Sequence, residues 1–263
     1  MKSLNLMLRV SSLAVGALCA AVGVADEVAY VGQDLGTISV SGTGKSTMVS
    51  VTFKELGTAG TDVSAANIVS TRNLAAGDQL FIYSNGGYVA WKLVEAGTAP
   101  STYLTWQKVD KKFSVGANGA LSNSEGQDAT DVTVPVGSGF WLVRNNSTTE
   151  NPFYIFGAYV APSTSTAAHG ATSLMGNPCM EAKSPVLTNV AEGDSIQLMG
   201  AKGLNVFNYT TINGEAKWRG VGKDANGKLV PYAETTPPSI PAGAGFWYVS
   251  KGSTDVTFNW SQN

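Results

Sequence analysis

Apolar residues along this chain come in short runs, and glycine, serine and threonine separate these runs. The runs are rich in β-branched and aromatic residues and end at turn-forming residues, which is the pattern of β-strands. The predicted strands are 28–31, 37–40, 48–53, 80–83 and 140–143. No long segment has the period of an amphipathic helix, and the best helix candidate is the short segment 63–69, with Thr61 or Asp62 as its cap. The sequence therefore predicts an all-β fold.

Three motifs occur twice in the same order along the chain. The first copy has Gly-Asp at 77–78, Trp106 and Pro-Val-Gly-Ser-Gly-Phe-Trp at 135–141, and the second has Gly-Asp at 193–194, Trp218 and Pro-Ala-Gly-Ala-Gly-Phe-Trp at 241–247. Such recurrence indicates a tandem repeat of one supersecondary unit. We expect two antiparallel β-sandwich or barrel-like repeats, residues 26–160 with the N-terminal strands and residues 172–263. Residues 161–171 are expected to form a polar linker.

Each repeated motif has a predicted structural role. Gly-Asp before a strand predicts a turn with a positive φ at the glycine, and Pro-x-Gly-x-Gly predicts a bend that delivers two aromatic residues onto a strand. Adjacent strand residues point to opposite faces, so one ring of each Phe-Trp pair should enter the core. The other should cover a second layer, a neighbouring repeat or a ligand. The residues expected to hold the repeats together are Gly137, Gly139, Phe140, Trp141 and Trp106, with Gly243, Gly245, Phe246, Trp247 and Trp218 in the second copy.

The second half also contains the segment Ser-Leu-Met-Gly-Asn-Pro at 173–178, ahead of its Gly-Asp, Trp and Phe-Trp motifs. This order resembles small β-repeats of many bacterial envelope and secreted proteins, which open with a Leu-x-Gly-Asn-Pro-like strand and close with a Pro-x-Gly-x-Gly-Phe-Trp strand. The first half departs from the pattern, because it has residues 48–53 in place of Gly-Asn-Pro. The resemblance implies the fold and an envelope or extracellular location, and it implies no catalytic residue.

The first 25 residues have the layout of a signal peptide. Lys2 and Arg9 precede an uncharged apolar run over 10–24, and Ala25 ends it before an acidic pair. We expect cleavage after Ala25 and export to the cell envelope or the medium of a bacterium. The run is shorter than the roughly 20 residues of a membrane-spanning helix, so no transmembrane anchor is expected after cleavage.

Composition argues against several functions. Charged residues make up 14% of the chain and the net charge is −2, so nucleic-acid binding is not expected. Cys179 is the single cysteine after the signal segment and is interpreted as a small buried hydrophobe. His169 is the only histidine, which argues against a histidine-based zinc site or a Ser-His-Asp triad. We therefore expect no enzyme activity, no cofactor and no metal site.

Three segments resemble ligand-binding loops in part. Residues 42–47 share letters with a phosphate-binding loop, but Ser39 replaces its first glycine and a strand follows, so a hairpin turn is favoured. Residues 224–228 contain Asn-Gly, the signal of a hairpin turn, and lack the ligands of a calcium loop. The acidic stretch 122–131 could hold a hard cation weakly, although a solvated loop is favoured.

Aromatic residues are the remaining functional candidates. In strand 80–83 the two aliphatic residues should face the core, which leaves Phe81 and Tyr83 on a face where polar residues are usual. Phe81, Tyr83, Trp91 and Trp260 are the candidate interface or ligand-facing residues. These features predict a non-catalytic exported structural or assembly protein, and the alternative is a carbohydrate-binding or adhesion module. The expected partner is a second copy, an envelope protein or a glycan.

Overall fold

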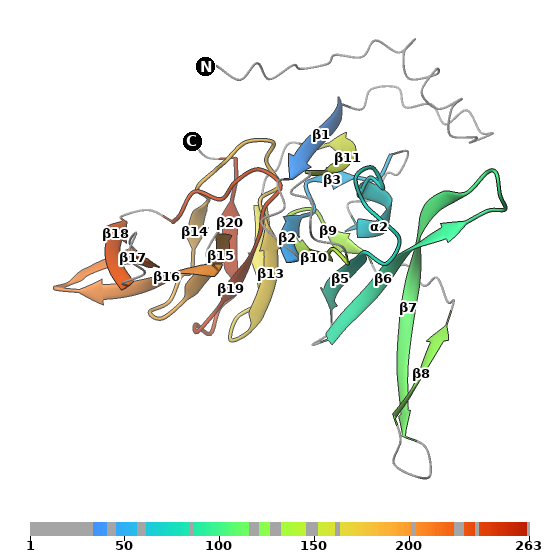
Figure 1. Ribbon diagram of the computed structural model, residues 1–263. Helices are drawn as coiled ribbons and strands as arrows, with labels where there is room; N and C mark the ends of the chain where they lie inside the picture. Colours follow the sequence, from blue (N-terminus) through green and yellow to red (C-terminus); the bar gives the residue numbers. More distant parts are fainter. Residues whose placement is uncertain are drawn as a thin grey trace. The chain divides into compact units, whose positions relative to one another are not determined.

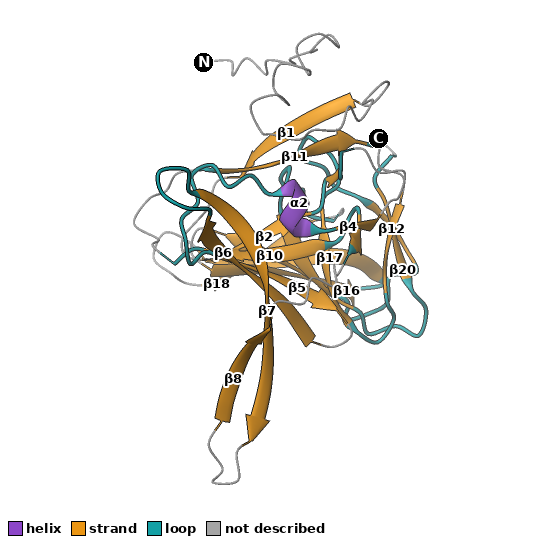
Figure 2. Cartoon of the chain, turned by 90° about the vertical axis from the view of Figure 1, so that its right-hand side faces the viewer, coloured by secondary structure: helices purple, strands orange, loops and turns teal. Residues whose placement is uncertain are grey.

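The structure is a computed structural model that describes residues 34–40, 46–56, 62–84, 87–115, 121–126, 133–145, 152–160, 164–200, 203–223, 229–234 and 237–261. Its regular elements are almost all antiparallel strands. The only helix among these residues is α2 (Ala65–Ile68), with four residues (Figure 2). The predicted all-β class is confirmed.

The strands before residue 160 form a large and a small sheet, with a further two-stranded ribbon. The large sheet has the order β2-β10-β5-β6-β7-β8, the small sheet β1-β11-β3, and the ribbon pairs β4 with β9 (Figure 1). The bounds are β1 (Asp34–Val40), β2 (Ser46–Ser50), β3 (Phe53–Lys54), β4 (Asp62–Val63), β5 (Gln79–Ser84), β6 (Gly87–Ala96), β7 (Tyr103–Val115), β8 (Leu121–Gly126), β9 (Val134–Pro135), β10 (Gly139–Val143) and β11 (Phe153–Tyr159).

The later strands form a second pair of sheets with corresponding orders. The large sheet is β13-β19-β15-β16-β17-β18 and the small sheet is β12-β20-β14. Trp141 and Trp247 each lie in the second strand of their large sheet, and Trp106 and Trp218 each lie in the fifth. The bounds are β12 (Thr164–Ala167), β13 (Thr172–Gly176), β14 (Val186–Thr188), β15 (Ser195–Gly200), β16 (Gly203–Ile212), β17 (Glu215–Lys223), β18 (Leu229–Glu234), β19 (Gly245–Val249) and β20 (Val256–Asn259).

Each half buries its apolar side chains between its small and its large sheet. In the first half, Phe153 of the small sheet belongs to the same core cluster as Leu80 and Ile82 of the large sheet. In the second half, the ring centroids of Phe258 and Phe246 lie 5.7 Å apart across the layers. Leu80 and Ile82 are both 0% exposed, so the prediction that their face of the strand is core is confirmed.

The polar segment 161–171 contains a strand, which the linker prediction missed. Residues 164–167 form β12, which pairs with β20 in the way that β1 pairs with β11. The Nε1–H of Trp260 donates to the hydroxyl of Ser165, 2.9 Å away. A serine and threonine strand at the edge of a small sheet lacks an apolar run, so its sequence pattern is the same as that of a linker.

The predicted helix and the predicted strand 48–53 are both shorter than expected. Asp62 belongs to β4 instead of capping a helix, and the N-cap is Ser64, whose backbone N–H donates to Glu55 Oε1 at 2.6 Å. Strand 48–53 divides into β2 and β3 because Val51 pairs with the Pro-x-Gly-x-Gly loop: its N–H donates to the carbonyl of Ser138 at 2.9 Å.

The two Gly-Asp turns have one geometry and one role. Gly77 has φ +96° and Gly193 has φ +87°, as predicted. The carboxylate of Asp78 accepts the backbone N–H groups of Ala75 and of Asn145, which follows β10 by two residues. The carboxylate of Asp194 accepts those of Ala191 and of Lys251, which follows β19 by two residues. Asp194 also accepts the hydroxyl of Tyr248 at 2.6 Å, and burial, followed by this bond, raises the pKa of Tyr248. Each of the two aspartates therefore links its turn to the end of β10 or β19 by hydrogen bonds.

The two halves meet at backbone contacts that we call the seam. The N–H of Ser50 donates to the carbonyl of Gly243 at 2.9 Å, and the N–H of Gly176 donates to that of Gly137 at 2.8 Å. The first bond joins the end of β2 to the Pro-x-Gly-x-Gly loop of the second half, and the second bond joins the end of β13 to that of the first half. The hydroxyl of Ser50 also donates to the carbonyl of Asn177 at 2.7 Å. The seam therefore follows the same plan in both directions.

The two glycines of the Pro-x-Gly-x-Gly motif serve different purposes. The first glycine has a positive φ, +91° at Gly137 and +70° at Gly243. The second allows the halves to approach: a Cβ on Gly139 would lie 2.5 Å from the carbonyl oxygen of Met175, and a Cβ on Gly245 would lie 2.8 Å from a backbone oxygen of the other half. No side chain fits at the second position without a backbone shift.

Candidate functional site

A cluster of aromatic side chains lies on the outer face of the first large sheet, opposite its core. It contains Phe81 and Tyr83 of β5, Tyr88 of β6 and Trp141 of β10, and Trp247 of β19 joins it from the second half. Four of these side chains are half-buried, and Tyr88 is 52% exposed. We call these five residues the aromatic patch.

The rings of the aromatic patch contact one another edge to face. Ring centroids lie 6.3 Å apart for Phe81 and Tyr88, 5.3 Å for Tyr83 and Tyr88, and 5.7 Å for Tyr83 and Trp247. Partial burial raises the pKa of Tyr88, a hydrogen bond from Trp141 opposes this rise, and the nearby Tyr83 adds to it. Such packing fixes the orientation of the rings while leaving part of their surface in solvent.

A row of polar side chains runs beside the aromatic patch on the same face. Gln79, Lys92 and Gln107 lie across from one another on β5, β6 and β7. Gln79 and Phe81 are two residues apart on one strand, which separates the polar row from the aromatic residues by about 7 Å. The outer face therefore combines aromatic rings with amide groups and one ammonium group.

The corresponding face of the second half has a different composition. Gln197 lies across from Trp247 as Phe81 lies across from Trp141, and Leu204, 48% exposed, is the second residue of β16 as Tyr88 is of β6. Because the two sheets share their strand order, this difference does not come from the fold. Four residues of the aromatic patch belong to the first half, and Trp247 is its one member from the second half.

Two of the four predicted interface residues lie in the core, and those predictions are wrong. Trp91 is 3% exposed and belongs to the first core cluster. Trp260 is 0% exposed and stacks on Phe258 with centroids 6.1 Å apart. Trp91 lies on the inner face of β6, across from Leu80, and sequence reasoning had not fixed the register of that strand.

The two rings of each Phe-Trp pair lie on opposite faces of their strand. Phe140 and Phe246 are fully buried while Trp141 and Trp247 are half-buried, so one ring of each pair enters the core. Trp218 is buried, and the half-buried Trp106 packs against the first core cluster. Tyr88 was missed, although Asn85-Gly86 is a two-residue hairpin signal that sets Tyr88 across from Tyr83.

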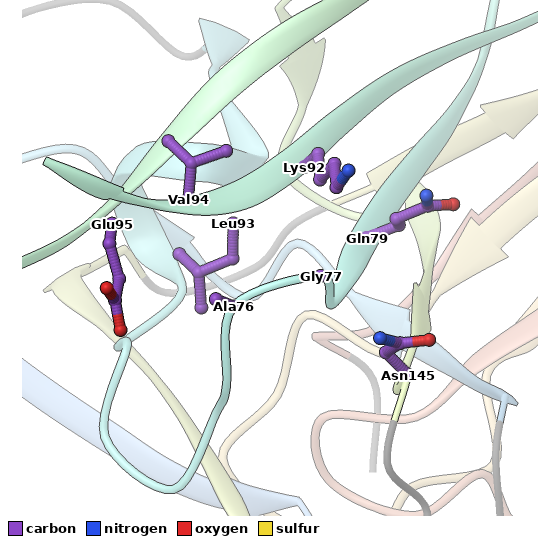
Figure 3. A pocket seen from close by; sticks show the side chains of 8 residues that line it. All are labelled: Ala76, Gly77, Gln79, Lys92, Leu93, Val94, Glu95 and Asn145. Atoms are coloured by element: carbon purple, nitrogen blue, oxygen red, sulfur yellow. The ribbon is translucent and has the colours of Figure 1, made fainter.

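A shallow hollow of about 530 Å³ lies at one end of the first large sheet (Figure 3). Ala76, Leu93 and Val94 line its middle, and Glu95 lies on the opposite side from the amide of Asn145. These polar groups do not point toward one another in Figure 3. The hollow is also lined by Gln79 and Lys92.

Metal-binding side chains do not gather among the described residues. No three His, Cys, Asp or Glu side chains lie close enough there to hold a metal ion. His169 contacts Asp255 at the surface and lowers its pKa through hydrogen bonds from the backbone N–H and the ring. Cys179 is buried and unpaired with another cysteine, and burial raises the pKa of its thiol.

The other sequence motifs yield little structural information. Thr47 and Met48 lie in β2, so the segment after 42–45 is a strand instead of the helix that a phosphate-binding loop requires. The segments 28–31, 42–45 and 224–228, and the side chains of the acidic stretch 122–131, lie outside the described residues. Lys223 and Leu229 pair across the segment 224–228, so its flanking strands form a hairpin.

Comparison of the chain with protein-family models, with curated proteins and with solved structures finds no match. In the described part of the chain, no helix has the length and apolar character needed to cross a membrane.

Proposed function

We propose that this protein is a non-catalytic exported protein of the bacterial envelope or extracellular space, and that it holds its partner through the aromatic patch. The observation that carries the proposal is the exposure of Tyr88, 52%, among four half-buried rings on one sheet face. A solvated outer face normally carries polar residues, as the corresponding face does at Gln197. Apolar patches of a few hundred Å² are often interaction sites.

The same proposal includes the architecture of the chain. We infer that it is a tandem pair of one two-layer β-unit, whose described parts span 34–160 and 164–261, so that the second unit begins with β12 instead of at residue 172. Support comes from the corresponding strand orders, the paired tryptophan positions and the reciprocal hydrogen bonds of the seam. The seam brings Trp247 against Tyr83, so the second half completes the aromatic patch.

Export rests on the signal-like segment 1–25. N-terminal sequencing of the protein from whole cells should give a chain that begins at Asp26. A chain that retains Met1 would contradict both the cleavage and the proposed location.

The test of the contact surface is retention in the cell envelope. The parent, a Tyr88→Ser variant and a Leu204→Ser control are expressed in the source bacterium, and envelope, periplasm and medium are separated. Leu204 is a suitable control because it is 48% exposed at the equivalent position of the second half. We expect Tyr88→Ser to shift from its bound fraction into the soluble fractions while the control fractionates as the parent does. Equal retention of both variants would contradict the proposal.

A further inference from the structure

We propose that the partner of the aromatic patch is a neutral polysaccharide, which lies across the outer face of the first large sheet. This inference rests on the proposed function and names the chemistry of its partner. A sugar ring has an apolar C–H face and a rim of hydroxyls, so it needs a flat aromatic surface next to hydrogen-bonding side chains. The outer face offers both, in two adjacent rows.

The aromatic row contains Trp141 of β10 and Phe81 of β5, which are cross-strand neighbours. Two residues further along β5, Tyr83 pairs with Tyr88 of β6, and their rings contact each other. Tyr88 is the most exposed ring of the group and offers its surface at the rim. Rings held by edge-to-face contacts lose little freedom when a ligand stacks on them.

The polar row provides the hydrogen-bonding groups. Gln79, Lys92 and Gln107 lie on three neighbouring strands, which spans about 10 Å at the usual strand spacing. An amide donates and accepts at once, as a hydroxyl does, so Gln79 and Gln107 match the rim of a sugar. Gln79 of this row lies about 7 Å from Phe81 of the aromatic row, because the two residues are two positions apart on β5.

Charge on this face favours an uncharged chain. The described side chains that share the face on β5, β6 and β7 include no Asp or Glu, and Lys92 is the one cation among them. A single ammonium group gives little attraction for a polymer with a charge on each sugar, and surface ion pairs contribute about 0–1 kcal/mol. A neutral sugar chain does not depend on ion pairs for its binding.

The size of the aromatic patch argues against a second protein. Aromatic side chains carry about 150–250 Å² each. With Tyr88 at 52% exposure and the other four rings mostly buried, the patch exposes roughly 300 Å². A stable protein interface buries about 800 Å² on each partner. The exposed area suits a ligand that is one chain wide.

The experiment measures binding of hexasaccharides to the full mature protein by titration calorimetry. The probes are maltohexaose, cellohexaose and N-acetylchitohexaose, with hexagalacturonate as the acidic comparison. We expect at least one neutral probe to bind more tightly than the acidic one. Tyr88→Ala and Gln107→Ala should each weaken that binding by about tenfold, equivalent to about 1.4 kcal/mol, while Leu204→Ala leaves it unchanged.

Absence of binding to all three neutral probes would overturn the inference. Binding that is indifferent to both Tyr88→Ala and Gln107→Ala, or stronger for hexagalacturonate, would overturn it as well. Sedimentation without saccharide provides an independent result: concentration-dependent dimers lost in Tyr88→Ala would identify a second copy as the partner and refute the glycan. If no glycan binds and Tyr88→Ser still releases the protein from the envelope, the inference fails while the proposed function stands.

Discussion

The seam can be tested by adding one methyl group to each half at Gly139 and Gly245. A Cβ on Gly139 would lie 2.5 Å from the carbonyl oxygen of Met175, and a Cβ on Gly245 would lie 2.8 Å and 2.9 Å from the backbone oxygen and nitrogen of Val49. These neighbours are backbone atoms of the other half, so they cannot rotate away. The methyl groups must separate the two halves or distort their strands.

The expected cost follows from the two clashes. Overpacking costs about 1–3 kcal/mol at each site, or about 2–6 kcal/mol for the Gly139→Ala, Gly245→Ala double variant. The reduced entropy of the unfolded chain returns about 1–2 kcal/mol for two alanines. At the middle of both ranges the net loss is about 2.5 kcal/mol, which lowers Tm by about 5–10 °C in a protein of this size.

The assay is thermal unfolding of the mature protein, followed by circular dichroism. Gly214→Asn is the control, because Gly214 has no atom within 4 Å of a new Cβ and asparagine tolerates its φ of +81°. The control should melt within a few degrees of the parent. A double variant that melts with the control would refute the close contact at the seam.

Three further predictions concern the patch and the buried groups. Phe81→Ser, Tyr83→Ser should lower the free energy of unfolding by about 1–4 kcal/mol in urea, since both rings are half-buried; unchanged unfolding would contradict their packing. Tyr248→Phe removes the hydroxyl bonded to Asp194 and should cost about 1.5–3 kcal/mol. Because the folded pKa of Tyr248 is raised, its contribution to the stability of the parent is full below about pH 10 and falls as the pH rises above that value, and the variant should lack this decline; an identical alkaline profile would refute the buried bond. The Cys179 thiol, whose pKa burial raises, should react with a thiol reagent at pH 8 only after unfolding, and prompt reaction of the native protein would contradict its burial.

Local patterns in the sequence predict some of the strands and turns of this fold. The alternation in strand 80–83 predicts that Leu80 and Ile82 face the core, and the Gly-Asp turns have the positive φ expected at Gly77 and Gly193. Each of these features depends on neighbouring residues alone. Strand β12 has no apolar run, and its stability depends on pairing with a strand about ninety residues away, so no local pattern indicated it.

The candidate site was only partly predictable for a similar reason. Phe81 and Tyr83 stand out because aromatic residues occupy positions where polar ones are usual. Trp91 lies in a strand of unknown register and Trp260 directly follows the last strand. Composition alone does not distinguish a buried ring from an exposed one. Tyr88 joins the patch through a cross-strand pair with Tyr83, which requires the register of the hairpin.

The most direct test of the account is oxidative footprinting of Tyr88 in intact envelopes. In the isolated chain Tyr88 is 52% exposed and Met180 of the second half is 42% exposed, so both side chains should be labelled in the purified protein. If the aromatic patch holds a partner in the cell, labelling of Tyr88 should fall in envelopes while labelling of Met180 stays as it is in the purified protein. Equal labelling of Tyr88 in both samples would contradict the proposed contact surface.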